Sequence, residues 1–202
     1  MEVKMGFDLY GLNPKLKSKR PKIDWDKKPT KAEADQYFKD VEKFEEENPG
    51  YYFRNNVWWW RPLADFVLWL ADEEFTKEER ERWHDNGGLK VNEKTAEVIA
   101  ELLEASIDEG IAQRMEEENK RKMNKAKLHN LEVQKKHDEL KMIVKEKTGK
   151  DNLVPADYPE PFNSQWNDIQ KLTNYEAHYP FSVENVKDFA RFCRESGGFQ
   201  IC

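Results

Sequence analysis

Apolar positions recur at helical spacing in several segments of the chain, and most of the residues between them are charged. The periodic segments predict helices that begin near residues 31, 62, 92 and 183, each with one apolar face for a core. The residues of these faces are Tyr37, Phe38, Val41 and Phe44; Leu63, Phe66, Val67 and Leu70; Ala96, Ile99, Leu102, Leu103 and Ile107; and Val183, Val186, Phe189, Ala190 and Cys193.

Capping residues mark where these helices begin. Thr30 and Thr76 each precede a glutamate by three positions, which is the capping-box pattern. Ser182 is the expected N-cap of the last helix. Pro62 suits the first turn of the helix that carries Leu63, because a first-turn residue needs no N–H.

Alternating apolar and polar residues predict strands only at the two ends of the chain. Met5 to Gly11 alternate and end in glycine, which is typical of a short strand. Phe199 to Cys202 can form a final strand beside it. The pattern as a whole predicts a mainly α-helical fold with a small β element, of the α+β class.

A charged segment interrupts the apolar periodicity in the second half of the chain. Residues 116–149 contain no proline and few apolar residues, although Leu128, Leu131, Leu140 and Ile143 return at helical spacing. This predicts a helical arm that either turns back on itself or pairs with a second chain, forming a homodimer through residues 116–147.

The arm divides the predicted domain into three parts. Residues 1–115 form the N-terminal part of the core, residues 116–149 are the arm, and residues 150–202 complete the core. The last part begins with an aromatic and proline-rich linker over residues 150–166, which we expect to be extended on a surface.

Charge and cysteine content exclude several classes of partner. The net charge of −6 gives no general attraction to nucleic acid or to an anionic membrane. No apolar run has the length of a transmembrane helix, and the first residues lack the apolar region of a signal peptide. Cys193 and Cys202 are expected to be reduced thiols. These features predict a cytoplasmic protein.

The densest cluster of aromatic residues is the segment from Tyr51 to Leu63, YYFRNNVWWWRPL. In an extended conformation, alternate residues of this segment lie on opposite sides. The more apolar side carries Phe53, Val57 and Trp59, which we expect in the core. The other side carries Tyr52, Arg54, Asn56, Trp58 and Trp60.

The polar side of this segment combines stacking planes, a guanidinium and an amide. These groups hold planar, anionic ligands, because rings stack on bases, arginine pairs with phosphate and asparagine reads base edges. The residues predicted to bind such a ligand are Arg54, Asn55, Asn56, Trp58, Trp60 and Arg61. In the structural alternative, Arg54 and Arg61 stack on the tryptophans and pair with Asp8 or Asp65 to seal the core.

Residues for catalysis or metal binding do not form any standard motif. His84, His129, His137 and His178 lack the spacing of a zinc site, so no metal or other cofactor is predicted. The sequence also lacks a nucleophile motif and a phosphate loop. A hydrolase that uses the scattered carboxylates Asp8, Asp65 and Asp85 with His84 is the weakest alternative.

Three segments resemble a group of small bacteriophage-encoded proteins of uncharacterised function. They are MGFDLYG, YYFRNNVWWWRPL and HYPFSVENVKDFARFCRESGGFQIC, which together cover about a quarter of the chain. Similar proteins begin at the first motif, so residues 1–4 are expected to be an extension. Many of them carry CxxC pairs in the middle segment. This chain has no cysteine there, so a zinc site is not carried over.

The resemblance implies a phage protein made in the bacterial cytoplasm. Together with the aromatic segment, it leads to the hypothesis of a non-enzymatic protein that sequesters a nucleotide-like host signalling ligand, an anti-defence role. The alternative is a module that inhibits a host protein through the helical arm, the proline-aromatic linker and acidic charge.

Overall fold

The computed structural model describes residues 6–202, which form two compact units. The first unit contains the described residues up to Glu116 together with Phe181–Cys202, and the second contains Glu117–Pro180. The expected extension, residues 1–4, lies outside the described residues, as does Met5. The predicted fold class is confirmed, because the structure is mainly helical with one small sheet.

An antiparallel sheet of four short strands organises the first unit. The strands are β1 (Gly6–Gly11), β2 (Tyr52–Asn56), β3 (Lys90–Val91) and β4 (Phe199–Ile201), in the order β2-β1-β4-β3. Strand β1 pairs with both β2 and β4, so the predicted pairing of the two ends of the chain is confirmed. Residues from the two ends of the chain and from the aromatic segment therefore meet in one sheet.

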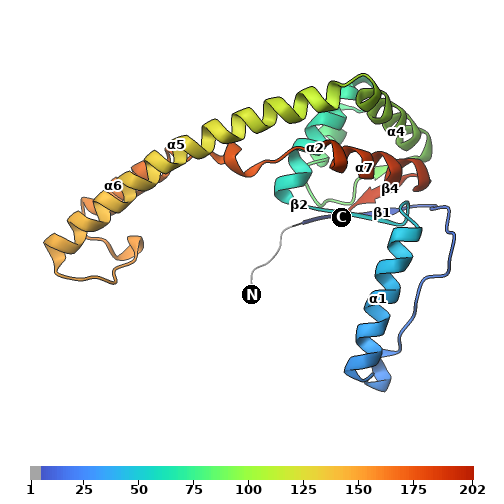
Figure 1. The fold of residues 1–202 in the computed structure, drawn as a ribbon, viewed down its shortest axis with the longest axis horizontal. Helices are drawn as coiled ribbons and strands as arrows, with labels where there is room; N and C mark the ends of the chain where they lie inside the picture. The colour runs from blue at the N-terminus through green and yellow to red at the C-terminus, as the bar shows by residue number, and fades with distance from the viewer. Residues whose placement is uncertain (1–5) are drawn as a thin grey trace. The chain divides into compact units, whose positions relative to one another are not determined.

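Three helices of the first unit lie on one side of this sheet (Figure 1). They are α2 (Val57–Leu70), α4 (Glu93–Asp108) and α7 (Val183–Glu195). Their apolar faces meet Phe7 and Leu9 of β1 and Phe199 and Ile201 of β4 in a single core. The remaining elements up to residue 91 are α1 (Lys31–Glu47), α3 (Lys77–Arg82) and the short 3-10 turns Trp25–Lys27 and Asp72–Glu74.

Side-chain caps set the starts of these helices. Both predicted capping boxes, at Thr30 and Thr76, are present, and Ser182 caps α7 as expected. The predicted start near Pro62 is wrong, because α2 begins at Val57. The Asn56 side chain accepts hydrogen bonds from the N–H groups of Trp58 and Trp59 at 3.0 and 3.2 Å, which satisfies the first turn there. Pro62 lies inside the helix.

The second unit is built on α5 (Ile111–Thr148), a helix of 38 residues that begins in the first unit. The chain then folds back on α5 through the 3-10 turn Pro155–Asp157, α6 (Phe162–Gln170) and the 3-10 turn Tyr175–His178. The residues that form the core of this unit are Leu140, Val144 and Tyr158, packed with Leu153, Phe162, Trp166 and Ile169.

This packing differs from the expected division of the chain. Residues 150–180, expected to complete the core with the C-terminal helix, belong to the second unit because their aromatic side chains pack on α5. The linker is therefore not extended, since α6 begins within it at Phe162. The buried face of α5 also differs from the predicted stripe: Leu140 is buried, but Leu128 and Leu131 are exposed.

Within residues 6–202, every helix falls short of the combined length and apolar character needed to cross a bilayer.

Candidate functional site: the open face of the sheet

The start of α2 at Val57 separates the six residues predicted to share a ligand-binding face. Strand alternation ends at Asn56, and each later residue turns by about 100° around the helix axis. Trp60 therefore points into the core with 0% exposure, between Phe7 and Trp83, whose ring centroids lie 5.3 and 5.7 Å away. Its indole N–H donates to the Trp83 carbonyl at 2.8 Å. Trp60 is a core residue and lines no surface.

The two asparagines of the predicted site have structural partners. The Asn55 amide donates to the Asn185 side chain at 3.0 Å, which ties β2 to α7. Asn56 is the N-cap of α2. Asn55 lies on the inner face of the sheet. Asn56 is exposed at the outer end of β2, opposite Gly6, and its side-chain oxygen is used by the cap.

Trp58 and Arg61 lie on the exposed side of α2. They share that side with Asp65 and Trp69, because residues three, seven and eleven positions after Trp58 return to the same face of a helix. Trp58 and Trp69 are 39% and 59% exposed. Of the residues expected in the core, Phe53 and Val57 pack against it, and Trp59 is half-buried.

Arg54 is the predicted site residue that lies on the outer face of the sheet next to the tyrosines. It lies opposite Asp8 in the register of β1 and β2, and its Nε is 3.4 Å from the Asp8 carboxylate. The Tyr52 hydroxyl donates to the same carboxylate. The pairing of Arg54 with Asp8 matches the structural alternative, but the pair is partly exposed rather than sealed in a core.

Beside this pair, four side chains form a row across the sheet. Tyr52 lies opposite Tyr10, Tyr10 opposite Gln200, and Gln200 opposite Lys90, one residue from each strand. The two tyrosine rings are 5.2 Å apart, and Tyr10 is 44% exposed. We call Asp8, Tyr10, Tyr52, Arg54, Lys90 and Gln200 the open face. It lies on the side of the sheet away from α2 and α7, because Phe7, Leu9, Phe199 and Ile201 occupy the inner side.

Arg20 borders the open face. Its guanidinium carbon lies 5.3 Å from the centre of the Tyr51 ring, a cation–π contact. Arg20 also lies close enough to Tyr10 to lower the pKa of that phenol, although the net shift is upward. The Gly11 N–H donates to the Tyr51 carbonyl. Along the paired strands, the Tyr10–Tyr52 pair therefore lies between the Asp8–Arg54 pair and Tyr51.

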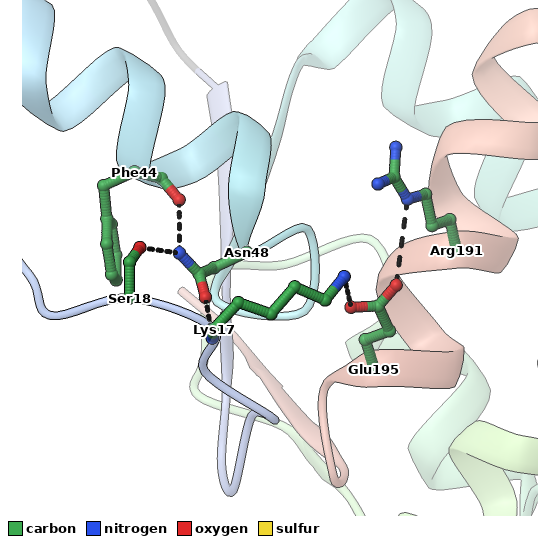
Figure 2. Close-up of polar contacts among 6 residues, drawn as sticks. All are labelled: Lys17, Ser18, Phe44, Asn48, Arg191 and Glu195. Atoms are coloured by element: carbon green, nitrogen blue, oxygen red, sulfur yellow. Dashed lines mark hydrogen bonds and ion pairs between the residues drawn. The ribbon is translucent and has the colours of Figure 1, made fainter.

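A buried asparagine holds the loop that carries Arg20 (Figure 2). Asn48, at the end of α1, is 1% exposed. Its side-chain oxygen accepts from the Lys17 backbone N–H at 2.5 Å, and its amide donates to the Ser18 hydroxyl at 2.9 Å and to the Phe44 carbonyl at 2.7 Å. The Lys17 ammonium pairs with Glu195 of α7 at 3.1 Å. The loop is therefore fixed at this point.

Both tyrosines of the open face stay protonated at neutral pH. Partial burial raises the pKa of Tyr10, and Asp8 and the Cys202 thiol add to the increase. Burial also raises the pKa of Tyr52, and the hydrogen bond to Asp8 raises it further. The open face therefore presents two neutral phenol rings beside the cations Arg54 and Lys90. Such a surface can stack on a planar group and attract an anion.

The residues proposed for acid–base chemistry converge only in part. The His84 imidazole lies 3.2 Å from the Asp65 carboxylate, but Asp8 pairs with Arg54 in the sheet and Asp85 accepts the Gly87 N–H in a turn. Among residues 6–202, histidine, cysteine and carboxylate side chains form no group of three or more that could hold a metal ion. Cys193 is buried and Cys202 half-buried, both as free thiols.

Sequence reasoning missed most of the open face. The outward positions of Asp8 and Tyr10 follow from the alternation of the first strand. Gln200 follows in the same way from the predicted final strand. Lys90 had no such signal, because β3 has only two residues.

Comparison with protein-family models, with curated proteins and with solved structures gives no match for this chain.

Proposed function

We propose that this chain is a non-enzymatic binding protein and that its open face binds a planar, anionic, nucleotide-like ligand. One observation carries the proposal: Tyr52, Tyr10, Gln200 and Lys90 lie side by side across all four strands, with Arg54 in the next position. A sheet that exposes aromatic rings in this way suits the stacking of bases, as in the RNA-recognition sheet of four strands.

The chemistry of each residue gives it a role in the proposed complex. A base stacks on Tyr10, and the Gln200 amide hydrogen-bonds its edge. Arg54 pairs with a phosphate, and Asp8 positions the guanidinium while holding the Tyr52 ring through its hydroxyl. In the phage setting that the sequence resemblance implies, the protein would sequester a host signalling nucleotide in the bacterial cytoplasm.

Isothermal titration calorimetry with a panel of cyclic and linear nucleotides tests the proposal. At least one nucleotide should bind, and Tyr10→Ala should weaken its binding about 5- to 150-fold, because stacking contributes about 1–3 kcal/mol per base. Tyr10→Phe keeps the ring and should bind as wild type does. Tyr175→Ala, which removes an exposed tyrosine in the second unit, is the matched control. Flat traces with every nucleotide would overturn the proposal.

The exposed side of α2 favours a second candidate function, the inhibition of a bacterial protein. Trp58 and Trp69 stand three turns apart with Arg61 and Asp65 between them, and tryptophan and arginine are enriched at the centres of protein interfaces. A pull-down from bacterial lysate should capture a partner that Trp69→Ser releases. Capture that is lost instead on deleting residues 116–147 would assign the contact to the arm and not to α2.

A further inference from the structure

A second cation stands on the opposite side of the tyrosine pair from Arg54. Along β1 and β2 the order of paired positions is Asp8 with Arg54, then Tyr10 with Tyr52, then Gly11 beside Tyr51. Arg20 lies over the Tyr51 ring and influences the Tyr10 phenol. Along the strands, the tyrosine pair therefore lies between Arg54 and the Tyr51 ring that Arg20 contacts.

Arg20 is positioned by its loop, which hydrogen bonds hold in place from Leu12 to Ser18. The backbone N–H groups of Leu12, Asn13 and Lys15 donate to carbonyls at the end of α7 and just beyond it, at 2.8–3.1 Å. Asn48 then binds the Lys17 N–H and the Ser18 hydroxyl. Asn48 is the last of these anchors before Arg20, and it is almost fully buried, so its hydrogen bonds are shielded from water.

We infer that Arg20 is a second phosphate-binding residue of the open face, that Asn48 is its positioning residue, and that the ligand is therefore a dinucleotide. This inference rests on the proposed function. A nucleoside monophosphate stacked on Tyr10 places its single phosphate on one side and engages one arginine. A dinucleotide carries phosphates on both sides of a stacked base and engages Arg54 and Arg20 together, each as a charge-assisted contact.

General electrostatic attraction between Arg20 and a phosphate would not depend on Asn48, whereas a positioned Arg20 does. Asn48 carries no charge and is buried, so it cannot contact the ligand. If it acts by holding the loop, its removal should weaken binding only through Arg20. Without Asn48, the nearest backbone anchor is at Lys15, and five peptide bonds separate that residue from Arg20.

A double-mutant cycle with calorimetry on the full chain tests the inference, using a cyclic dinucleotide and the matching mononucleotide. Wild type should bind the dinucleotide about tenfold more tightly. Arg20→Ala and Asn48→Ala should each remove that preference, and the double variant should bind no more weakly than Arg20→Ala alone. Asn163→Ala removes a side-chain hydrogen bond in the second unit and should leave the preference intact.

Tryptic cleavage after Lys19 reports the position of the loop without any ligand. Asn48→Ala should accelerate this cleavage at least tenfold, while circular dichroism shows that the helices remain. If Asn48→Ala does not fold, Ser18→Ala removes one of the three partners of Asn48 and should give a smaller acceleration and a smaller loss of preference.

The outcomes separate this inference from the proposed function. Equal binding of both nucleotides, or a preference that survives Arg20→Ala, overturns the dinucleotide inference and leaves the proposed function standing if Tyr10→Ala still weakens binding. A preference lost in Arg20→Ala but kept in Asn48→Ala overturns the role of Asn48. Flat traces with wild type overturn both.

Discussion

Replacing Trp60 with alanine should destabilise the first unit more than the same change at either neighbouring tryptophan. Trp60 is fully buried and packs against Phe7, Trp83 and Phe189. Truncating a buried tryptophan to alanine costs about 3–5 kcal/mol. The lost hydrogen bond to the Trp83 carbonyl adds about 1 kcal/mol. The expected loss in the free energy of unfolding is about 4–6 kcal/mol.

Trp58→Ala is the matched control, because it removes the same side chain two residues away. Trp58 is 39% exposed, so less apolar surface returns to water and the expected cost is about 1–2 kcal/mol. Pulsed hydrogen exchange across a urea series, read on peptides from α7 and β4, measures the stability of the first unit alone. Equal losses in the two variants would refute the assignment of Trp60 to the core and Trp58 to the surface.

Three further predictions concern local structure. Asn56→Ala should cost about 1 kcal/mol in the unfolding of the first unit, with Asn56→Asp close to wild type, because the α2 N-cap needs only an acceptor. Gly50→Ala should cost about 3 kcal/mol or more in the same assay, since its Cβ would overlap the backbone of Glu195. Burial lowers the pKa of His137, whose ring packs on Trp166, while Asp138 and the side chain of Gln170 oppose the decrease. The unfolded chain then binds the proton more readily, so protection of α6 from hydrogen exchange should fall as pH drops below about 6.5, and His137→Leu should remove this dependence.

Local signals in the sequence determined much of the first unit. The capping boxes at Thr30 and Thr76 and the cap at Ser182 depend on residues within one helical turn, so they could be identified without the structure. The pairing of β1 with β4 followed from two short alternating segments at the ends of the chain. The start of α2 was missed because alternation was extended through Asn56, whose capping side chain ends the strand.

The candidate site could be predicted only in part, because it depends on contacts between distant segments. Arg54 was identified, but its position on the open face is set by the register with Asp8, 46 positions earlier in the sequence. Arg20 joins the site through Asn48, a buried residue whose partners Lys17 and Ser18 lie about 30 positions earlier in the sequence. Trp60 illustrates the opposite error, since aromatic composition alone does not distinguish a stacking surface from a core.

Alkylation of Cys202 tests the central claim, that the open face binds the ligand, without any substitution. The Cys202 backbone exchanges hydrogen bonds with Asp8, and its half-exposed thiol lies near Tyr10, whereas Cys193 is buried and serves as an internal control. The measurement is the rate of maleimide modification of each cysteine, by mass spectrometry, across the nucleotide panel. At least one nucleotide should slow modification of Cys202 in a saturable manner while Cys193 stays unmodified. A nucleotide that binds by calorimetry at saturating concentration and leaves the Cys202 rate unchanged would contradict the account.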